Sequence, residues 1–171
     1  MKSILSHQKP DDYGEQFQNH LLEIYKLYVD MADKISSRRQ SANSFFLSVN
    51  TAIIAVIGYV QLGIKKNVST DFYWLISLAG IAICYTWYRL IKSYRGLNSG
   101  KFSVIHNIEQ QLPIAPFDAE WEALGKGKDP KKYLPFTKVE MVVPWIFLIL
   151  HVVVFLKAIP WSYIKSTICS S

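Results

Sequence analysis

The sequence predicts an all-α membrane protein with three transmembrane helices, and three observations lead to this fold class. The first is three long apolar stretches without a charge, at residues 45–64, 72–88 and 141–156. The second is the aromatic residues at the edges of these stretches, as in the headgroup belts of membrane proteins. The third is the absence of proline and glycine from residues 15–57, which predicts a long N-terminal helix continuous with the first span.

The stretch 45–64 has the length that a membrane-spanning helix needs. Its 20 residues rise about 30 Å as an α-helix, which matches the hydrocarbon thickness of a bilayer. It lies inside an uncharged run of 25 residues, 40–64, whereas a soluble helix usually needs a polar face. A soluble helical domain, which the mean hydropathy of +0.13 would permit, is therefore the less favoured alternative. A secretory signal peptide is not expected, because the apolar run begins only at residue 45.

The other two stretches are shorter, with 17 and 16 residues. Each reaches full length if the basic residue at its end, Arg89 or Lys157, extends toward the membrane interface. The predicted organisation is a cytoplasmic N-terminal amphipathic helix (1–43), a first transmembrane helix (44–64), a short outer loop (65–71), a second transmembrane helix (72–91), a cytoplasmic helical segment (92–139), a third transmembrane helix (140–160) and an outer C-terminal tail (161–171).

The distribution of positive charge predicts the orientation in the membrane. The N-terminal segment contains six lysines and arginines and residues 89–140 contain nine, whereas the loop and the tail contain two each. The positive-inside rule therefore places the N-terminus and the central segment in the cytoplasm and the C-terminus outside. The net charge of +6 favours anionic lipid as a partner over nucleic acid, because six acidic residues offset the basic residues of the central segment.

Two periodic patterns run along the first helix. Apolar residues recur at spacings of three and four from residue 17 to residue 35, which is typical of an amphipathic helix. A second pattern, here called the small-residue line, alternates the same spacings and crosses the predicted membrane boundary; it consists of Ser37, Ser41, Ser44, Ser48, Thr51, Ala55 and Gly58. Small residues permit close approach of a neighbouring helix in lipid, so we expect an oligomer interface here. Packing inside one subunit and chance are the alternatives.

Polar residues inside the predicted spans are functional candidates by default. Asn43 and Asn50 lie on the stripe adjacent to the small-residue line, and in a helix bundle they either hydrogen-bond across helices or face water. Together with Thr51 they are the expected lining if the oligomer encloses a pore. His151 lies near the middle of the third span. A neutral histidine that hydrogen-bonds a neighbouring helix is an equally good interpretation, and no span supplies the carboxylate that proton transport would need.

The central segment is predicted to be a small helical subdomain. The apolar spacing suggests a helix over 98–112 with Asn98 or Ser99 as its cap, then a short helix over 117–124 opened by Pro116. Residues 125–130 have the composition of a loop. Thr137, with Glu140 three residues later, is the expected capping box of the third span.

No catalytic or metal-binding set emerges from the sequence. Residues 96–102 look like a phosphate-binding loop but are one residue short between the glycines and carry Phe102 where a Ser or Thr should follow the lysine. The pairs His106 with Glu109 and Asp118 with Glu122 each share a helix face, but two ligands make no metal site. The two cysteines, Cys84 and Cys169, have no metal or redox spacing, and a disulfide between subunits through the second is unsupported.

The chain contains several unusual runs: residues 38–47 leading into 50–52, residues 94–102, and residues 112–113, 120–121 and 137–140 before Pro144. Together they resemble the RipA family of octameric membrane proteins, which are small bacterial inner-membrane proteins. The resemblance extends from about Leu22 to the third span. It implies a homo-octamer in the cytoplasmic membrane, with three spans per subunit and a cytoplasmic part. It transfers no catalytic residue.

We therefore expect a non-enzymatic homo-oligomer that builds a ring-like scaffold in the bacterial inner membrane. The resemblance implies that this oligomer is an octamer. The expected partners are other copies of the chain and membrane lipid. No cofactor, metal, nucleic acid or small-molecule substrate is indicated. A channel formed by the same oligomer and gated through the cytoplasmic segment is the alternative, and a membrane-bound enzyme that uses His106, Glu109, Asp118 or Glu122 is the least favoured.

Overall fold

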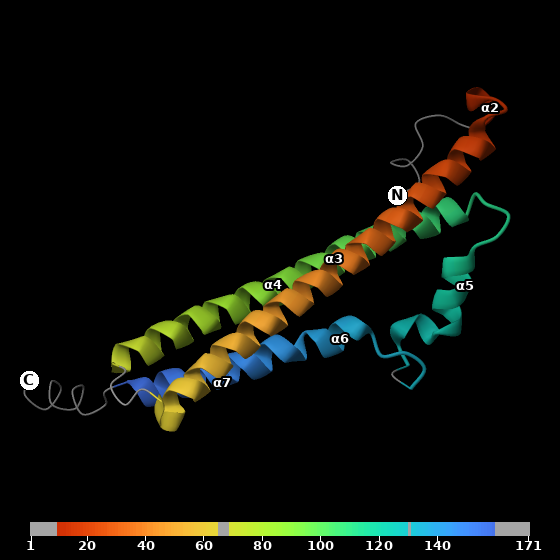
Figure 1. The fold of residues 1–171 in the computed structure, drawn as a ribbon. Helices are drawn as coiled ribbons and strands as arrows, with labels where there is room; N and C mark the ends of the chain where they lie inside the picture. Colours follow the sequence, from red (N-terminus) through yellow and green to blue (C-terminus); the bar gives the residue numbers. More distant parts are fainter. Residues whose placement is uncertain (1–9, 65–68, 130, 160–171) are drawn as a thin grey trace, which may run out of the picture. The chain divides into compact units, whose positions relative to one another are not determined.

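The computed structural model describes residues 10–64, 69–129 and 131–159, and every regular element in these ranges is helical. The elements shown in Figure 1 are α2 (Pro10–Tyr13), α3 (Phe17–Tyr59), the π-helical turn η1 (Val60–Ile64), α4 (Thr70–Glu109), α5 (Pro116–Ala123), the 3-10 turn η2 (Gly125–Gly127), α6 (Phe136–Glu140) and α7 (Val142–Ala158). The loop at 65–68 and the tail from 160 onward, with the expectations attached to them and to Cys169, lie outside the described residues.

Three helices are long and apolar enough to cross a membrane within the described ranges, as the fold class predicts. They correspond to α3 with its π-helical end, to α4, and to α7 extended back to Lys138. The first of these is the long N-terminal helix that the absence of proline and glycine indicated, since α3 is continuous over 43 residues. The predicted fold class is confirmed.

The chain divides into two compact units that share α3 and α4. One unit consists of Met1–Gln40 with Lys92–Phe136, and the other of Ser41–Ile91 with Thr137–Ser171. The second unit contains the apolar parts of all three spans. Each unit has its own buried residues, among them Leu21, Ile35 and Ile105 in the first unit and Ile57 and Trp87 in the second.

The expected helix start at Asn98 is wrong. Helix α4 runs without a break from the second span to Glu109, and both Gly96 and Gly100 lie inside it. The expected start rested on Asn98 or Ser99 as a cap, and each glycine costs the helix about 1 kcal/mol relative to alanine. Burial of Ile105 and Ile108 farther along the same helix outweighs that cost, because most helix stability in proteins comes from tertiary packing.

The third span begins with an interruption. Helix α6 ends at Glu140, Met141 forms a turn, and α7 starts at Val142. Proline has no backbone N–H, so Pro144 cannot donate to the carbonyl of Glu140, four residues earlier.

The short helix predicted before the loop at 125–130 is present as α5, which begins at Pro116.

The loop after α5 depends on glycine. Gly125, Lys126 and Gly127 have φ values of +68°, +55° and +67°, in the left-handed region that favours glycine. A Cβ on Gly127 would also lie 2.9 Å from the Cη2 atom of Trp121. Of the residues predicted as a loop, 125–127 thus form a 3-10 turn, 128 and 129 are irregular, and 130 lies outside the described residues.

Candidate functional site

The small-residue line lies on the outside of the subunit. Its members are exposed with the exception of Gly58, which is partly exposed. Ser37 belongs to the first unit and the remaining six residues to the second. The hydroxyl of Ser48 donates a hydrogen bond of 2.9 Å to the carbonyl of Ser44, which satisfies it within its own helix. Packing within one subunit therefore leaves this line accessible.

The opposite side of α3 carries a buried amide that connects three helices. Asn50 is fully buried, and its side-chain NH2 donates to the carbonyl of Phe46 at 2.8 Å. Its oxygen accepts two hydrogen bonds of 3.1 Å, one from the thiol of Cys84 on α4 and one from Nε2 of His151 on α7. Because the amide oxygen can only accept, Nε2 of His151 is the donor in this hydrogen bond.

His151 packs directly against the backbone of α4. It is fully buried, and its Nδ1 atom has no hydrogen-bond partner among the described residues. A Cβ built on Gly80 would lie within 2.6 Å of Nε2 in the imidazole ring. Gly80 therefore provides the space that lets α7 approach α4 at this depth. His151 on α7 thus hydrogen-bonds a neighbouring helix, α3, through its contact with Asn50.

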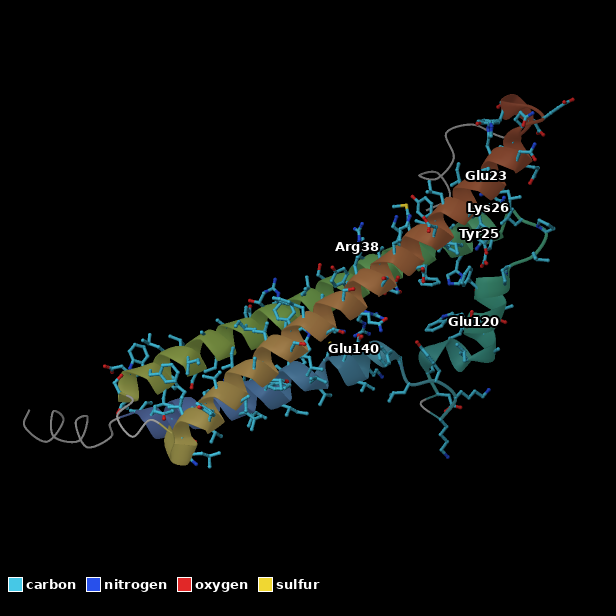
Figure 2. The ribbon with its side chains drawn as sticks, in the orientation of Figure 1. Glu23, Tyr25, Lys26, Arg38, Glu120 and Glu140 are labelled. Atoms are coloured by element: carbon cyan, nitrogen blue, oxygen red, sulfur yellow. The ribbon has the colours of Figure 1, made fainter. Side chains whose placement is uncertain are left out.

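A second polar connection lies about two turns along α3. The indole N–H of Trp87 donates to Oδ1 of Asn43 at 2.8 Å, and the amide of Asn43 donates to Oε1 of Glu140 at 2.8 Å. Trp87 also stacks on the ring of Phe46, with centroids 5.8 Å apart. Figure 2 labels Glu140 at the end of α6. Glu140 thus accepts a hydrogen bond from α3. The side chain of Thr137, its expected partner in a capping box, lies outside the described residues.

The three residues named for a pore lining therefore have different surroundings. Asn43 and Asn50 hold hydrogen bonds inside the second unit, and Thr51 is exposed on the small-residue line. The pore itself stays a prediction.

In the first unit, Glu109 is a buried carboxylate that caps a helix. It is 1% exposed, and its two oxygens accept hydrogen bonds from the backbone N–H groups of Phe117 and Asp118, at 2.9 and 3.1 Å. These N–H groups belong to the first turn of α5, where a carboxylate is favourable. The phenol of Tyr25 on α3, labelled in Figure 2, donates to the same carboxylate at 3.0 Å. Glu109 therefore joins α3, α4 and α5.

The groups around Glu109 include two of the other suspected active-site residues, His106 and Asp118. Nδ1 of His106 lies 3.4 Å from Oε2 of Glu109 and 3.8 Å from Oδ1 of Asp118. Burial, and secondly the hydrogen bond to Glu109 and its charge, raise the pKa of Tyr25 to about 12. The phenol therefore remains a hydrogen-bond donor throughout the neutral range.

Glu122 is directed to a different partner. Its carboxylate pairs with Lys126 at 2.8 Å, and the hydrogen bond between them lowers the pKa of Glu122 and raises that of Lys126. Both side chains are exposed, so this pair has little weight for stability. No group of three or more His, Cys, Asp or Glu side chains able to hold a metal occurs in the described ranges.

The sequence did not identify the partners of the two central residues of these clusters. For Asn50 it left a hydrogen bond across helices and a pore lining open, and for Glu109 it gave a pairing with His106 on one helix face. In the structure each residue joins helices inside the chain. The signal for Glu109 was present in the sequence, since Pro116 opens a helix a few residues later and its N–H groups need an acceptor. The partners of Asn50 come from helices 34 and 101 residues away, which a single sequence does not connect.

A family model described as the octameric membrane protein family (8xMP) matches residues 22–160. The match includes nearly all of α3 and every later helix. It confirms the resemblance to octameric membrane proteins that the sequence runs carry. No curated protein and no solved structure matches the chain.

Proposed function

The chain belongs to the octameric membrane protein family, and from this premise we propose that it is a non-enzymatic subunit of a ring-like scaffold in the bacterial cytoplasmic membrane. Three helices long and apolar enough to span a bilayer make it a multi-pass membrane protein. Copies inserted by one mechanism share one orientation, so the symmetry axis stands perpendicular to the membrane. Eight copies around such an axis form a closed ring.

The observation that carries this proposal is the exposure of the small-residue line. A helix surface that faces lipid does not need small residues, whereas a surface that faces another helix benefits from them. Within the second unit, the line is accessible over four turns of α3 while the asparagines on the other side of the helix are engaged. We assign the line to the contact between subunits.

The scaffold presents a cytoplasmic portion. The excess of lysine and arginine in the N-terminal and central segments supports this orientation. The first unit, built from these two segments, then lies in the cytoplasm and is available to partners of the assembly.

The surroundings of the polar clusters support a structural function over catalysis. Both oxygens of Glu109 accept hydrogen bonds from the backbone of α5, and the oxygen of Asn50 accepts two donors. A general base needs a free lone pair directed at its substrate, and these groups use theirs to hold helices together. The channel alternative would depend on Thr51, since its other two lining residues are bonded inside the subunit.

The test is the mass of the detergent-solubilised particle after a change on the small-residue line. The double variant Ser48→Leu, Ala55→Leu should dissociate the assembly, because two bulky side chains prevent close approach of the neighbouring helix. The matched control Ser48→Ala, Ala55→Ser keeps both side chains small and should retain the wild-type mass. An intact assembly in the leucine variant would remove the line from the interface.

A further inference from the structure

A ring in a membrane requires two different contact faces on each subunit. In a cyclic assembly the contacts are heterologous, so that one surface of a subunit meets another surface of the next. The small-residue line therefore does not pack on itself but on some other exposed face. The identity of this second face is inferred on the premise of the proposed ring.

Two exposed faces in the second unit have the right period. The α4 outer line alternates spacings of three and four residues and consists of Leu75, Leu78, Ala82 and Tyr85, all exposed. The α7 outer line has the same period and consists of Val142, Ile146, Ile149, Val153 and Leu156, also exposed. A period of 3.5 residues is what a left-handed helix pair presents to its partner.

The chemistry of the two lines differs. Every member of the α7 outer line is a large aliphatic side chain, which is the surface that lipid favours. The α4 outer line mixes large and small residues, and two further small residues, Ala79 and Thr86, are exposed beside it. Small residues on a membrane helix indicate contact with another helix. The composition therefore assigns α7 to lipid and α4 to the neighbouring subunit.

The depth of the residues in the membrane agrees with this assignment. The hydrogen bond between Asn50 and Cys84 places these two residues at one level of the antiparallel helices α3 and α4. Counting residues outward from this level pairs each residue of the small-residue line with one of the α4 outer line, within one residue or about 1.5 Å along the helix axis. The pairs are Gly58 with Leu75, Ala55 with Leu78, Thr51 with Ala82 and Ser48 with Tyr85.

Rotation about an axis perpendicular to the membrane leaves the depth of every residue unchanged. The small-residue line of one subunit therefore meets the α4 outer line of the next subunit in register. We infer that α3 of each subunit packs against α4 of its neighbour, with Leu75, Leu78 and Tyr85 seated on Gly58, Ala55 and Ser48. A large side chain opposite a small one at three levels is the complementarity that close packing requires.

Tyr85 has an additional constraint at this contact. Its hydroxyl accepts a hydrogen bond of 3.1 Å from Arg89, and the guanidinium carbon lies 5.9 Å from the centre of its ring. The ring is thus restrained on the outer side of α4, where it is 56% exposed in the single subunit. A restrained aromatic side chain loses little entropy when it is buried by a partner.

Disulfide cross-linking tests the inference. In a background with Cys84→Ser and Cys169→Ser, the pair Ala55→Cys and Leu78→Cys should form disulfides between subunits upon oxidation with copper phenanthroline. Because each subunit then carries one cysteine on each face, a non-reducing gel should show a ladder that extends to eight chains. Either single variant should remain monomeric on the same gel, since the two faces are different.

Two matched pairs serve as controls. Ala55→Cys with Tyr85→Cys separates the thiols by about 10 Å along the helix axis, beyond the reach of a disulfide. Ala55→Cys with Leu156→Cys tests the α7 outer line at the depth of Ala55, because Asn50 and His151 share a level on parallel helices. Neither pair should give a ladder.

The mass of each particle, measured before oxidation, separates the two proposals. A ladder with Leu156→Cys, or an eight-chain particle without a ladder from the Ala55→Cys, Leu78→Cys pair, would overturn the α3–α4 contact and leave the ring intact. Dimers from Ala55→Cys alone would overturn the α3–α4 contact and would also contradict a ring whose contacts at this line are heterologous. A particle with the mass of one chain would overturn both the contact and the proposed ring.

Discussion

The buried amide of Asn50 illustrates how a polar residue determines the packing of membrane helices. Leucines in a bilayer pack equally well in several registers, because lipid and protein are similarly apolar. The amide of Asn50 accepts hydrogen bonds from Cys84 and His151 and donates one to the carbonyl of Phe46. These three hydrogen bonds can form together in one register only. The cost of leaving such a group unbonded therefore selects one arrangement of α3, α4 and α7.

The contact between Gly80 and His151 leads to the first prediction. Gly80→Ala places a methyl group within 2.6 Å of the imidazole and should destabilise the protein by about 1–3 kcal/mol, as overpacking does. Thermal unfolding in detergent measures this change. Gly96→Ala is the control, since nothing lies within 4 Å of a Cβ there. Equal unfolding temperatures for Gly80→Ala and wild type would show that α7 does not approach α4 at this point.

Tyr25 gives a prediction on pH. The pKa of its phenol is raised from the ordinary 10.0 to about 12, so the contribution of the neutral phenol to stability is complete below pH 10 and is lost as the pH rises through 12. The ultraviolet difference titration of wild type against Tyr25→Phe should show ionisation of this residue near pH 12. Ionisation near pH 10 would mean that Tyr25 neither is buried nor donates to Glu109.

At the scale of the elements, the start of α5 is bonded to one carboxylate. This helix has no buried residue of its own, and its first two free N–H groups donate to Glu109. The ring of Phe117 adds contacts with Phe102 and Tyr25, with centroids 5.6 and 6.4 Å apart. Glu109 therefore provides the backbone hydrogen bonds that attach the first turn of α5 to the unit.

Glu109→Gln should loosen α5 without unfolding the unit. A neutral acceptor binds N–H groups less strongly than a charged one, by about 1.5 kcal/mol, so the amides of Phe117 and Asp118 should exchange hydrogen about ten times faster. Glu120→Gln changes the same chemistry at an exposed position of α5 and should leave exchange unaltered. Unchanged protection of both amides in Glu109→Gln would contradict the capping function.

The elements also show what a single sequence can and cannot predict. The lengths of the apolar runs and the gap in proline and glycine predicted α3 and the three spans, because these features depend on local composition. The expected helix start at Asn98 was wrong, since the continuity of α4 depends on the distant contacts that bury Ile105 and Ile108. The partners of Asn50 likewise depend on three-dimensional packing.

At the scale of the whole molecule, charge predicts the orientation. A single cysteine introduced at the exposed position Ser99 should react with a membrane-impermeant maleimide only when the cytoplasmic side is open, as in inverted vesicles. A cysteine at Ser69, exposed at the start of α4, should react only from the other side. Labelling of Ser99→Cys from outside intact cells would reverse the proposed orientation.

We propose that this chain assembles as a ring of eight copies, and native mass spectrometry of the wild-type protein in lipid nanodiscs is the decisive test. We expect one dominant species with eight times the 19.7 kDa of the chain, which loses subunits only at high collision energy. A dominant species with the mass of one or two chains, at every protein-to-lipid ratio, would contradict the ring.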